Sequence, residues 1–291
     1  MRAIALALLL VVAPAPAIAA EPVSVRLGRR VAVPARPLRV VSLAPSLTEI
    51  AYAVGAGDRL VGVTDNCDFP PEVAGKPRIG GLYTPNFEAI LSARPDLVLG
   101  TTEGNREEHL KRIEALGLAL YVVKPVDLAS VLDAIGRVGR VLGQAPETER
   151  LVAALSRDAD AVSRAVEGAR RPRVLYVVWG SPLIVPGRDT LLTDLIRRAG
   201  GESVSGAEPQ EYPRFSMEEA LARQPERIVL GGHGRRSIEE HLRLWPQLRL
   251  LAAAREGRVG VVDGDLTHRS GPRVIEALRE LARLIHPEVA W

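Results

Sequence analysis

The sequence predicts an α/β protein made of two Rossmann-like lobes bridged by one long rigid helix. Three observations lead to this fold class. Short apolar segments alternate with amphipathic segments along most of the chain, which is typical of strands connected by helices. Two stretches, residues 86–99 and 216–229, repeat one another without a gap. Between them, a helical pattern runs without interruption from Pro146 to Val166.

The N-terminus has the features of a secretory signal peptide over residues 1–20. Arg2 gives a positive start, residues 3–12 form an apolar run, and a small-x-small pattern ends at Ala19. The apolar run is too short to span a bilayer as a helix. We therefore expect cleavage near Ala19-Ala20 and a periplasmic location for the mature protein.

The first lobe is expected over residues 39–144. It begins with a buried strand at 39–43 and a helix from Ser46, where Ser46 and Glu49 have the spacing of a capping box. The remaining elements are expected in this order: strand 60–63, a Pro- and Gly-rich loop 65–84, a helix from Asn86, strand 97–99, helix 106–116, strand 119–123 and helix 127–142.

A linking helix is expected over residues 145–168. The segment from Pro146 to Val166 contains no internal Gly or Pro and places apolar residues such as Leu155 and Val162 at helical spacing. At ~1.5 Å per residue such a helix is about 30 Å long, enough to cross from one lobe to the other. An ordinary surface helix of one domain is the alternative.

The second lobe is expected over residues 172–288. Its elements are a strand at 173–178, a helix at 190–199, a helix from Ser216, a strand at 227–230, a helix from Ser237, a strand at 258–262 and a helix at 272–284. Short crossovers between alternating strands and helices imply mainly parallel sheets. Because ligands of such sheets lie beyond the carboxyl ends of the strands, we expect the binding cleft between the lobes.

The repeat places one glutamate at an equivalent position in each lobe, Glu88 and Glu218. Leu91 and Leu221 are also identical, and each copy runs from a helix cap to a Pro-acid pair and an apolar strand. A carboxylate presented twice suits a two-fold-symmetric partner. The alternatives are a chance repeat of a common helix-to-strand unit, and glutamates that only stabilise the start of their helices.

The composition argues against several function classes. The chain has 38 Lys and Arg against 35 Asp and Glu, and only 4% aromatic residues, so it lacks the concentrated basic face of a nucleic-acid-binding protein. Cys67 is the only cysteine, so no internal disulfide forms. The histidines show no HExxH spacing, and the chain has no Gly-x-Ser-x-Gly elbow. We expect no enzymatic activity, no metal site and no cofactor.

The large rings indicate a binding cleft. Phe69, Tyr83, Trp179 and Tyr212 fall in loops between strands and helices, outside the apolar stripes of the helices. In a chain so poor in aromatic residues, this placement favours a cleft walled by rings and suited to a large flat ligand. Loop packing of each ring is the alternative.

The segment containing Asp265, His268 and Arg269 is a second candidate site. His268 can contact a ligand, and its alternative is a hydrogen-bonded loop histidine. A secreted metal-dependent hydrolase that uses His268 and Asp265 is the alternative from another functional class. A sensor or scaffold domain that binds a partner without transport is a third hypothesis.

Several motifs resemble the periplasmic binding proteins for cobalamin, haem and ferric siderophores. They occupy residues 39–50, 57–63, 67–72 and 86–98, with a Gly-Pro-Arg turn at 271–273. The resemblance implies two lobes joined by one rigid helix and a ligand held in the cleft between them. It also implies delivery to the permease dimer of an ABC importer, and we expect a monomer.

Within that superfamily the segments at 67–71 and 265–269 look most like the cobalamin receptors. A corrinoid is therefore the expected ligand, with haem or a ferric siderophore as the alternative. The resemblance implies that Asn66 and Phe69 lie beside the ligand in the first lobe and that residues 265–269 form the opposite wall.

The same resemblance implies that Glu88 and Glu218 meet arginines of the transporter. Three departures from the enteric cobalamin receptor bear on the ligand. That receptor has a tyrosine where this chain has Asn66, and tryptophans where it has Leu82 and Leu266.

Overall fold

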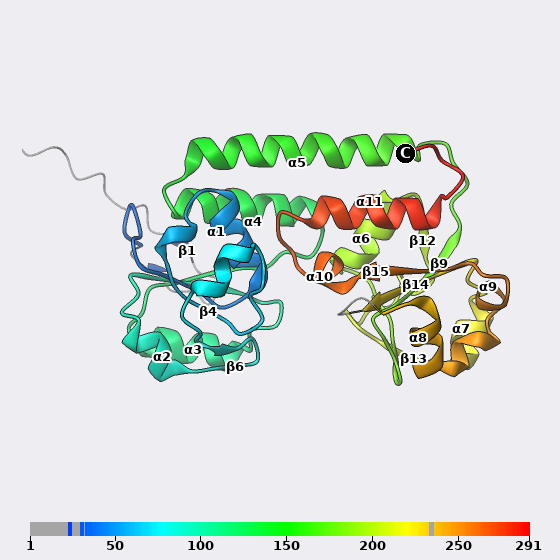
Figure 1. The fold of residues 1–291 in the computed structure, drawn as a ribbon, viewed down its shortest axis with the longest axis horizontal. Coiled ribbons are helices and arrows are strands. Elements are labelled where there is room, and N and C mark those ends of the chain that lie inside the picture. The colour runs from blue at the N-terminus through cyan, green and yellow to red at the C-terminus, as the bar shows by residue number, and fades with distance from the viewer. Residues whose placement is uncertain (1–22, 25–29, 32, 233–235) are drawn as a thin grey trace, which may run out of the picture.

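The structure is a computed structural model that describes residues 23–24, 30–31, 33–232 and 236–291. The predicted signal peptide at residues 1–20 lies outside the described residues. The chain forms two α/β lobes joined along one side by the long helix α5 (Ala145–Ala165), as Figure 1 shows. Within the described residues, no helix combines the length and the apolar character needed to cross a membrane.

The first lobe is built on a parallel sheet with the strand order β4-β3-β7-β8. Its strands are β3 (Val40–Ser42), β4 (Leu60–Val63), β7 (Leu97–Thr101) and β8 (Leu120–Val123). These strands are almost entirely buried, as expected for a parallel sheet covered on both faces. The covering helices are α1 (Pro45–Ala53) and α4 (Leu128–Val141) on one face and α2 (Phe87–Ser92) and α3 (Glu107–Ala115) on the other.

The second lobe repeats this plan with the parallel strand order β12-β9-β14-β15. Its strands are β9 (Arg173–Val177), β12 (Glu202–Ser203), β14 (Arg227–Gly232) and β15 (Val259–Asp263). Helices α6 (Leu191–Arg198) and α11 (Val274–Ile285) pack on the face toward α5. The other face carries α7 (Met217–Ala222), α8 (Ile238–Leu244), η3 (Pro246–Leu250) and α9 (Ala252–Arg255).

Short elements complete the lobes. Two antiparallel hairpins pair β1 (Val23–Ser24) with β2 (Arg30–Val31) and β5 (Gly80–Gly81) with β6 (Thr84–Pro85). The other short elements are the 3-10 helices η1 (Gly57–Arg59) and η2 (Pro71–Gly75), the antiparallel strands β10 (Trp179–Gly180), β11 (Leu183–Ile184) and β13 (Arg214–Phe215), and the helix α10 (Gly264–Thr267). The β5–β6 turn and the segment before β13 matter most below, because both contribute to the cleft between the lobes.

Helix α5 confirms the predicted bridge. It packs on α4 of the first lobe and on α11 of the second. One buried apolar cluster accordingly runs through both lobes and includes Val138 of α4, Val162 of α5 and Leu278 of α11. Two further clusters each belong to a single lobe. The lobes therefore share a core on the α5 side and are separate only on the opposite side.

The two copies of the sequence repeat fold in the same way. The side chains of Asn86 and Ser216 cap α2 and α7, and both helices contain six residues. After each helix one residue adopts a left-handed backbone conformation, Arg94 with φ of 45° and Gln224 with φ of 48°. Neither residue is glycine, so both copies adopt the same uncommon conformation.

Long-range contacts around the two copies also match. Arg39 donates from Nε to the carbonyl of Arg94, and Arg173 donates from Nε to the carbonyl of Gln224, each at 3.0 Å. The backbone N–H groups of Arg39 and Arg173 donate to carboxylates two residues beyond Arg94 and Gln224. A chance similarity of two short segments does not account for matching contacts with distant strands, so the repeat reflects two equivalent lobes.

Helix α1 departs from the prediction. Its N-cap is Ala44, Pro45 occupies the first turn, and no side chain caps the helix. Because proline is well suited to the first helical position, the helix begins before Ser46, which cannot then be the cap. The predicted capping box between Ser46 and Glu49 is wrong. Glu49 instead turns its buried carboxylate toward the second lobe.

Candidate functional site

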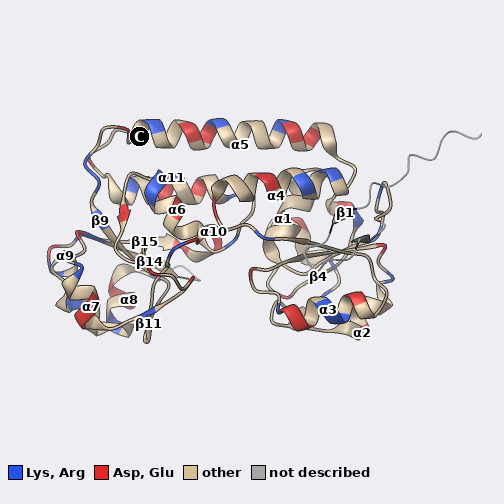
Figure 2. Cartoon of the chain, turned by 180° about the vertical axis from the view of Figure 1, so that it is seen from behind, with Lys and Arg blue, Asp and Glu red and all other residues tan. Residues whose placement is uncertain are grey.

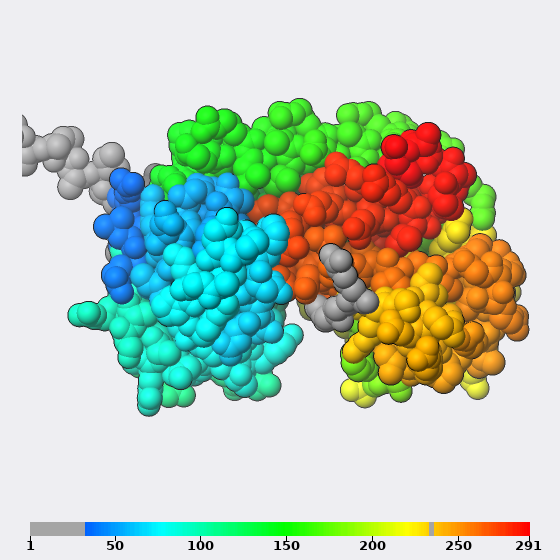
Figure 3. All heavy atoms as spheres, viewed as in Figure 1, coloured from blue at the N-terminus to red at the C-terminus, as the bar shows by residue number. Residues whose placement is uncertain are grey.

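A cavity of about 610 Å³ lies between the lobes. The space-filling view shows the hollow between them on the side away from α5 (Figure 3). Lining residues follow the carboxyl ends of strands in both lobes, with Glu103 after β7, Lys124 after β8 and Val178 after β9. This is where parallel α/β sheets bind their ligands.

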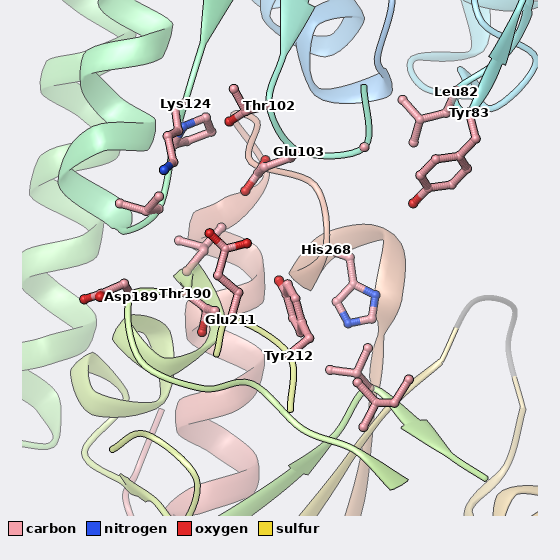
Figure 4. A pocket seen from close by; sticks show the side chains of 16 residues that line it. Leu82, Tyr83, Thr102, Glu103, Lys124, Asp189, Thr190, Glu211, Tyr212 and His268 are labelled. Carbon is pink, nitrogen blue, oxygen red and sulfur yellow. The ribbon is translucent and has the colours of Figure 1, made fainter. Parts of the chain in front are cut away.

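Three of the predicted site residues come together in this cavity: Tyr83, Tyr212 and His268 (Figure 4). Tyr83 belongs to the turn between β5 and β6 in the first lobe and is 58% exposed. Tyr212 precedes β13 in the second lobe and is 50% exposed. Rings from both lobes therefore border the space, which suits a ligand that presents a broad flat surface.

His268 is oriented by a buried tyrosine. Its Nε2 atom lies 3.2 Å from the hydroxyl of Tyr176, which is also 2.8 Å from the hydroxyl of Thr267. The Tyr176 and His268 rings meet edge to face, with 6.0 Å between their centroids. His268 is thus a hydrogen-bonded loop histidine and also a residue of the cavity wall.

The predicted residues Asn66 and Phe69 are not among the described residues that line the cavity. Asn66 Oδ1 accepts a hydrogen bond from the backbone N–H of Leu82 at 3.0 Å, so Asn66 holds the turn that carries Tyr83. Phe69 is 41% exposed and lies under the guanidinium of Arg273, 4.1 Å from the ring centroid.

Trp179 also lies outside the cavity lining as the structure describes it. Its ring meets the ring of Trp245 edge to face at 5.9 Å, and its Nε1 donates to the carbonyl of Ser181. Half of the Trp179 side chain is exposed. Its contacts stabilise the antiparallel strands β10 and β11 at the edge of the second lobe.

Arg269 belongs to an ion-pair cluster between the lobes, and Asp265 lies beside that cluster. We define the interlobe cluster as Glu49 and Asp68 of the first lobe with Arg269 and Arg273 of the second. Arg273 contacts the Glu49 carboxylate through two nitrogens at 2.6 and 2.9 Å. Arg269 lies 2.6 Å from Asp68 and 3.3 Å from Glu49, and Asp265 pairs with it at 2.8 Å.

The interlobe cluster is electrostatically well matched. The hydrogen bond from Arg269 is the main cause that lowers the pKa of Asp68 below its usual value. The hydrogen bond to Glu49 is the main cause that raises the pKa of Arg273. A bidentate Arg–carboxylate contact fixes geometry as well as charge, so the cluster defines how the two lobes face one another.

The cavity itself is acidic. Its lining includes the carboxylates of Glu103, Asp189 and Glu211, and Lys124 is the only lysine or arginine among the described residues that line it. Burial is the main cause that raises the pKa of Glu103 to about 7, and the charge of Glu211 raises it further. A 2.7 Å hydrogen bond from the hydroxyl of Ser270 partly opposes this increase. The cavity therefore disfavours additional negative charge.

Glu103, Lys124 and Glu211 were not among the site residues predicted from the sequence. Glu103 and Lys124 follow predicted strands. Because ligands bind at the carboxyl ends of parallel strands, the sequence contained enough information to predict these two residues as part of the site. Glu211 lies in an irregular loop whose approach to the first lobe has no local sequence signal. The predicted docking residues Glu88 and Glu218 are exposed in the first turns of α2 and α7, away from the cavity lining.

Comparison with known proteins agrees with this geometry. A family model described as periplasmic binding protein matches residues 40–266. A vitamin B12-binding protein of Photorhabdus laumondii is 29% identical over 254 residues, covering 87% of this chain and 89% of the relative.

Two solved structures share the fold. The periplasmic vitamin B12-binding protein BtuF of Vibrio cholerae has a TM-score of 0.77 and 25% identity, covering 86% of this chain and 97% of that one. The periplasmic haem-binding protein RhuT from Roseiflexus sp. RS-1 has a TM-score of 0.76 and 30% identity, covering 86% and 98%. The two-lobed fold, the bridging helix and the family match agree: the chain belongs to the periplasmic binding protein family.

Proposed function

We propose that this protein is an extracytoplasmic receptor that captures a corrinoid between its lobes and delivers it to an ABC importer. The observation that carries this proposal is the interlobe cavity, which is bordered by exposed rings from both lobes in a periplasmic binding protein fold. Cobalamin combines a flat corrin with amide arms, so it suits both the rings and the polar wall. Relatives named as vitamin B12-binding proteins support this choice of ligand.

Haem is the second candidate, since the Roseiflexus haem-binding protein is 30% identical to this chain. Tyr83, Tyr212 and His268 carry phenol and imidazole groups, which are axial ligands of haem iron in other proteins. However, the two negatively charged haem propionates would enter a cavity that already holds the carboxylates of Glu103 and Glu211. Lys124 is the only lysine or arginine in the described lining that would balance these charges. The amide arms of cobalamin carry no such charge, which favours the corrinoid.

A direct titration tests the ligand. Purified mature protein is titrated separately with cyanocobalamin, haemin and a ferric hydroxamate, and binding is followed by calorimetry. We expect saturable one-to-one binding of cyanocobalamin and weaker binding of the other two. Absence of cyanocobalamin binding at micromolar protein would exclude it as the ligand.

The proposal extends to processing and partners. The signal peptide over residues 1–20 is cleaved near Ala19-Ala20, and the mature protein is a periplasmic monomer. It docks on a permease dimer through Glu88 and Glu218, one from each lobe.

The protein has no enzymatic role in this proposal. Asp265 supports this conclusion, because its carboxylate pairs with Arg269 at 2.8 Å in the region of the interlobe cluster. A metal-dependent hydrolase using Asp265 and His268 would instead turn over an ester or phosphate and lose that turnover in Asp265→Ala. Such a result would replace the receptor with an enzyme.

A further inference from the structure

Two carboxylates from different lobes face one another in the cavity. Glu103 follows β7 in the first lobe, and Glu211 precedes β13 in the second. Figure 4 shows their carboxylates pointing toward the same part of the cavity, with Tyr212 beside them. A ligand that fills the space between the lobes therefore meets an acidic group from each side.

Glu103 is held firmly in this position. The hydroxyl of Ser270 donates to its Oε1 at 2.7 Å. Ser270 is buried, and it lies in the segment whose arginines Arg269 and Arg273 are anchored to Glu49. The Glu103 carboxylate is thus tied to the contact that fixes the two lobes, so it is preorganised before a ligand enters.

Above its pKa of about 7 the Glu103 carboxylate is mainly ionised, and the chemistry of an ionised carboxylate defines what it recognises. It accepts hydrogen bonds and donates none, so its partners on a ligand are N–H or O–H groups. A ligand carboxylate in the same place brings like charges together in a partly desolvated site, which is strongly unfavourable. Within the protein itself, burial is the main cause that raises the pKa of Glu103, and the charge of Glu211 adds to the increase.

We propose that Glu103 and Glu211 act together as a specificity element that accepts hydrogen bonds from ligand amides and rejects ligands bearing carboxylates. This inference rests on the proposed corrinoid receptor function and deepens it. The pair distinguishes intact cobalamin, whose peripheral arms end in amides, from a corrinoid in which one arm has been hydrolysed to the acid.

The test compares two ligands that differ at one group. At about pH 8, where Glu103 is mainly ionised, wild-type protein and variants are titrated with cyanocobalamin and with the monocarboxylic acid obtained by hydrolysing one of its propionamide arms. The test variant is Glu103→Gln with Glu211→Gln, which keeps size and an acceptor oxygen but removes both charges. The matched control is Glu147→Gln with Glu149→Gln, because both residues are exposed at the start of α5, outside the cavity lining.

We expect the wild type and the control to bind the acid at least about tenfold more weakly than the amide, because like charges are juxtaposed in the cleft. In the double glutamine variant the two affinities should agree within about twofold. If that variant does not fold, Glu211→Gln alone carries the test, since Glu211 is exposed in a loop. It should then reduce the discrimination by at least about threefold.

The outcomes separate the two proposals. If the wild type binds the amide and the acid equally, or if the variant keeps the full discrimination, the specificity element is wrong and the receptor function stands. If cyanocobalamin does not bind, the proposed ligand is wrong, and haemin and its dimethyl ester provide the same comparison. If the wild type binds the dimethyl ester more tightly than haemin, and the double glutamine variant binds the two equally, the specificity element is supported. If the wild type shows no preference for the ester, or binds neither compound, the specificity element is wrong.

Discussion

Glu103 is a carboxylic acid whose ionisation is opposed by its surroundings. The groups that face it are Ser270 from the loop before α11, Glu211 and Tyr212 from the segment before β13, and Lys124 from the end of β8 in the shared lining. Desolvation of the Tyr212 hydroxyl raises the pKa of this half-exposed side chain, and the charges of Glu103 and Glu211 add to the increase. The hydroxyl of Tyr212 therefore stays protonated at neutral pH.

The pKa of Glu103 predicts a pH-dependent stability. It rises from 4.5 to about 7 on folding, so between these values the folded state binds more protons than the unfolded state. Stability should therefore fall as pH rises through this window. Glu103→Gln removes this loss, so its stability relative to wild type should increase by up to roughly 3 kcal/mol between pH 4.5 and pH 8. Urea unfolding at several pH values measures this difference, and parallel curves for the two proteins would contradict the prediction.

Glu49 is expected to contribute strongly to stability. It is buried and pairs with both Arg269 and Arg273 from the other lobe. Removing one member of a buried ionic cluster leaves uncompensated charge, so Glu49→Ala should destabilise the protein by about 3–5 kcal/mol. Glu147→Ala breaks the exposed pair with Arg150 and should cost about 1 kcal/mol or less. Similar losses in the two variants would show that the interlobe cluster contributes no more than a surface pair.

At the scale of elements, helices α2 and α7 form a matched pair. Both lie on the side of the molecule away from α5, as the two opposite views in Figures 1 and 2 agree. Each carries an exposed glutamate in its first turn, Glu88 or Glu218, and an exposed leucine one turn later, Leu91 or Leu221. The common fold of the two copies thus presents the same acidic and apolar groups twice on one side of the molecule.

We predict that Glu88→Lys with Glu218→Lys abolishes productive docking. Ligand affinity should stay within about twofold of wild type, because neither residue lines the cavity. Stimulation of the importer ATPase should fall strongly, and docking of the wild type should weaken with salt, as expected for exposed charges. Glu147→Lys with Glu149→Lys, at the start of α5, is the matched control. If the Glu88→Lys, Glu218→Lys variant stimulates the importer ATPase normally, the two glutamates only stabilise the starts of their helices.

The elements differ in how well the sequence predicts them. The buried strands and α5 follow from periodicity, and α5 begins and ends within one residue of the predicted Pro146–Val166 helix. The start of α1 was misassigned because Pro45 competes with Ser46 for the beginning of the helix. The interlobe cluster was not predictable, because Glu49 and Arg273 are 224 positions apart and neither has a local signal for the other. The same reason hides the approach of Glu211 to Glu103.

At the scale of the whole molecule, two features oppose large movements of the lobes. The apolar cluster that includes α4, α5 and α11 is continuous between the lobes. The interlobe cluster connects α1 directly to the segment before α11, through Glu49, Arg269 and Arg273. Large hinge motions need a few residues whose backbone can change conformation, whereas a continuous helix keeps every backbone hydrogen bond. The molecule therefore combines a cleft between the lobes with a stiff connection on the α5 side.

This stiffness predicts that ligand binding changes the overall shape very little. Small-angle scattering profiles with and without cyanocobalamin should nearly coincide, because the interface backbone of a preorganised complex moves by only about 1 Å or less on binding. Ala153→Pro should remove that restraint, because proline in the interior of α5 breaks the helix at an exposed position without disturbing the cleft. Ala153→Gly keeps the helix at a cost of about 1 kcal/mol and serves as the control. A change of several ångströms in the wild type would mean that α5 bends on binding. If ligand binding changes the radius of gyration equally little in the wild type and in Ala153→Pro, the stiffness comes from the shared core and the interlobe cluster and not from the helix.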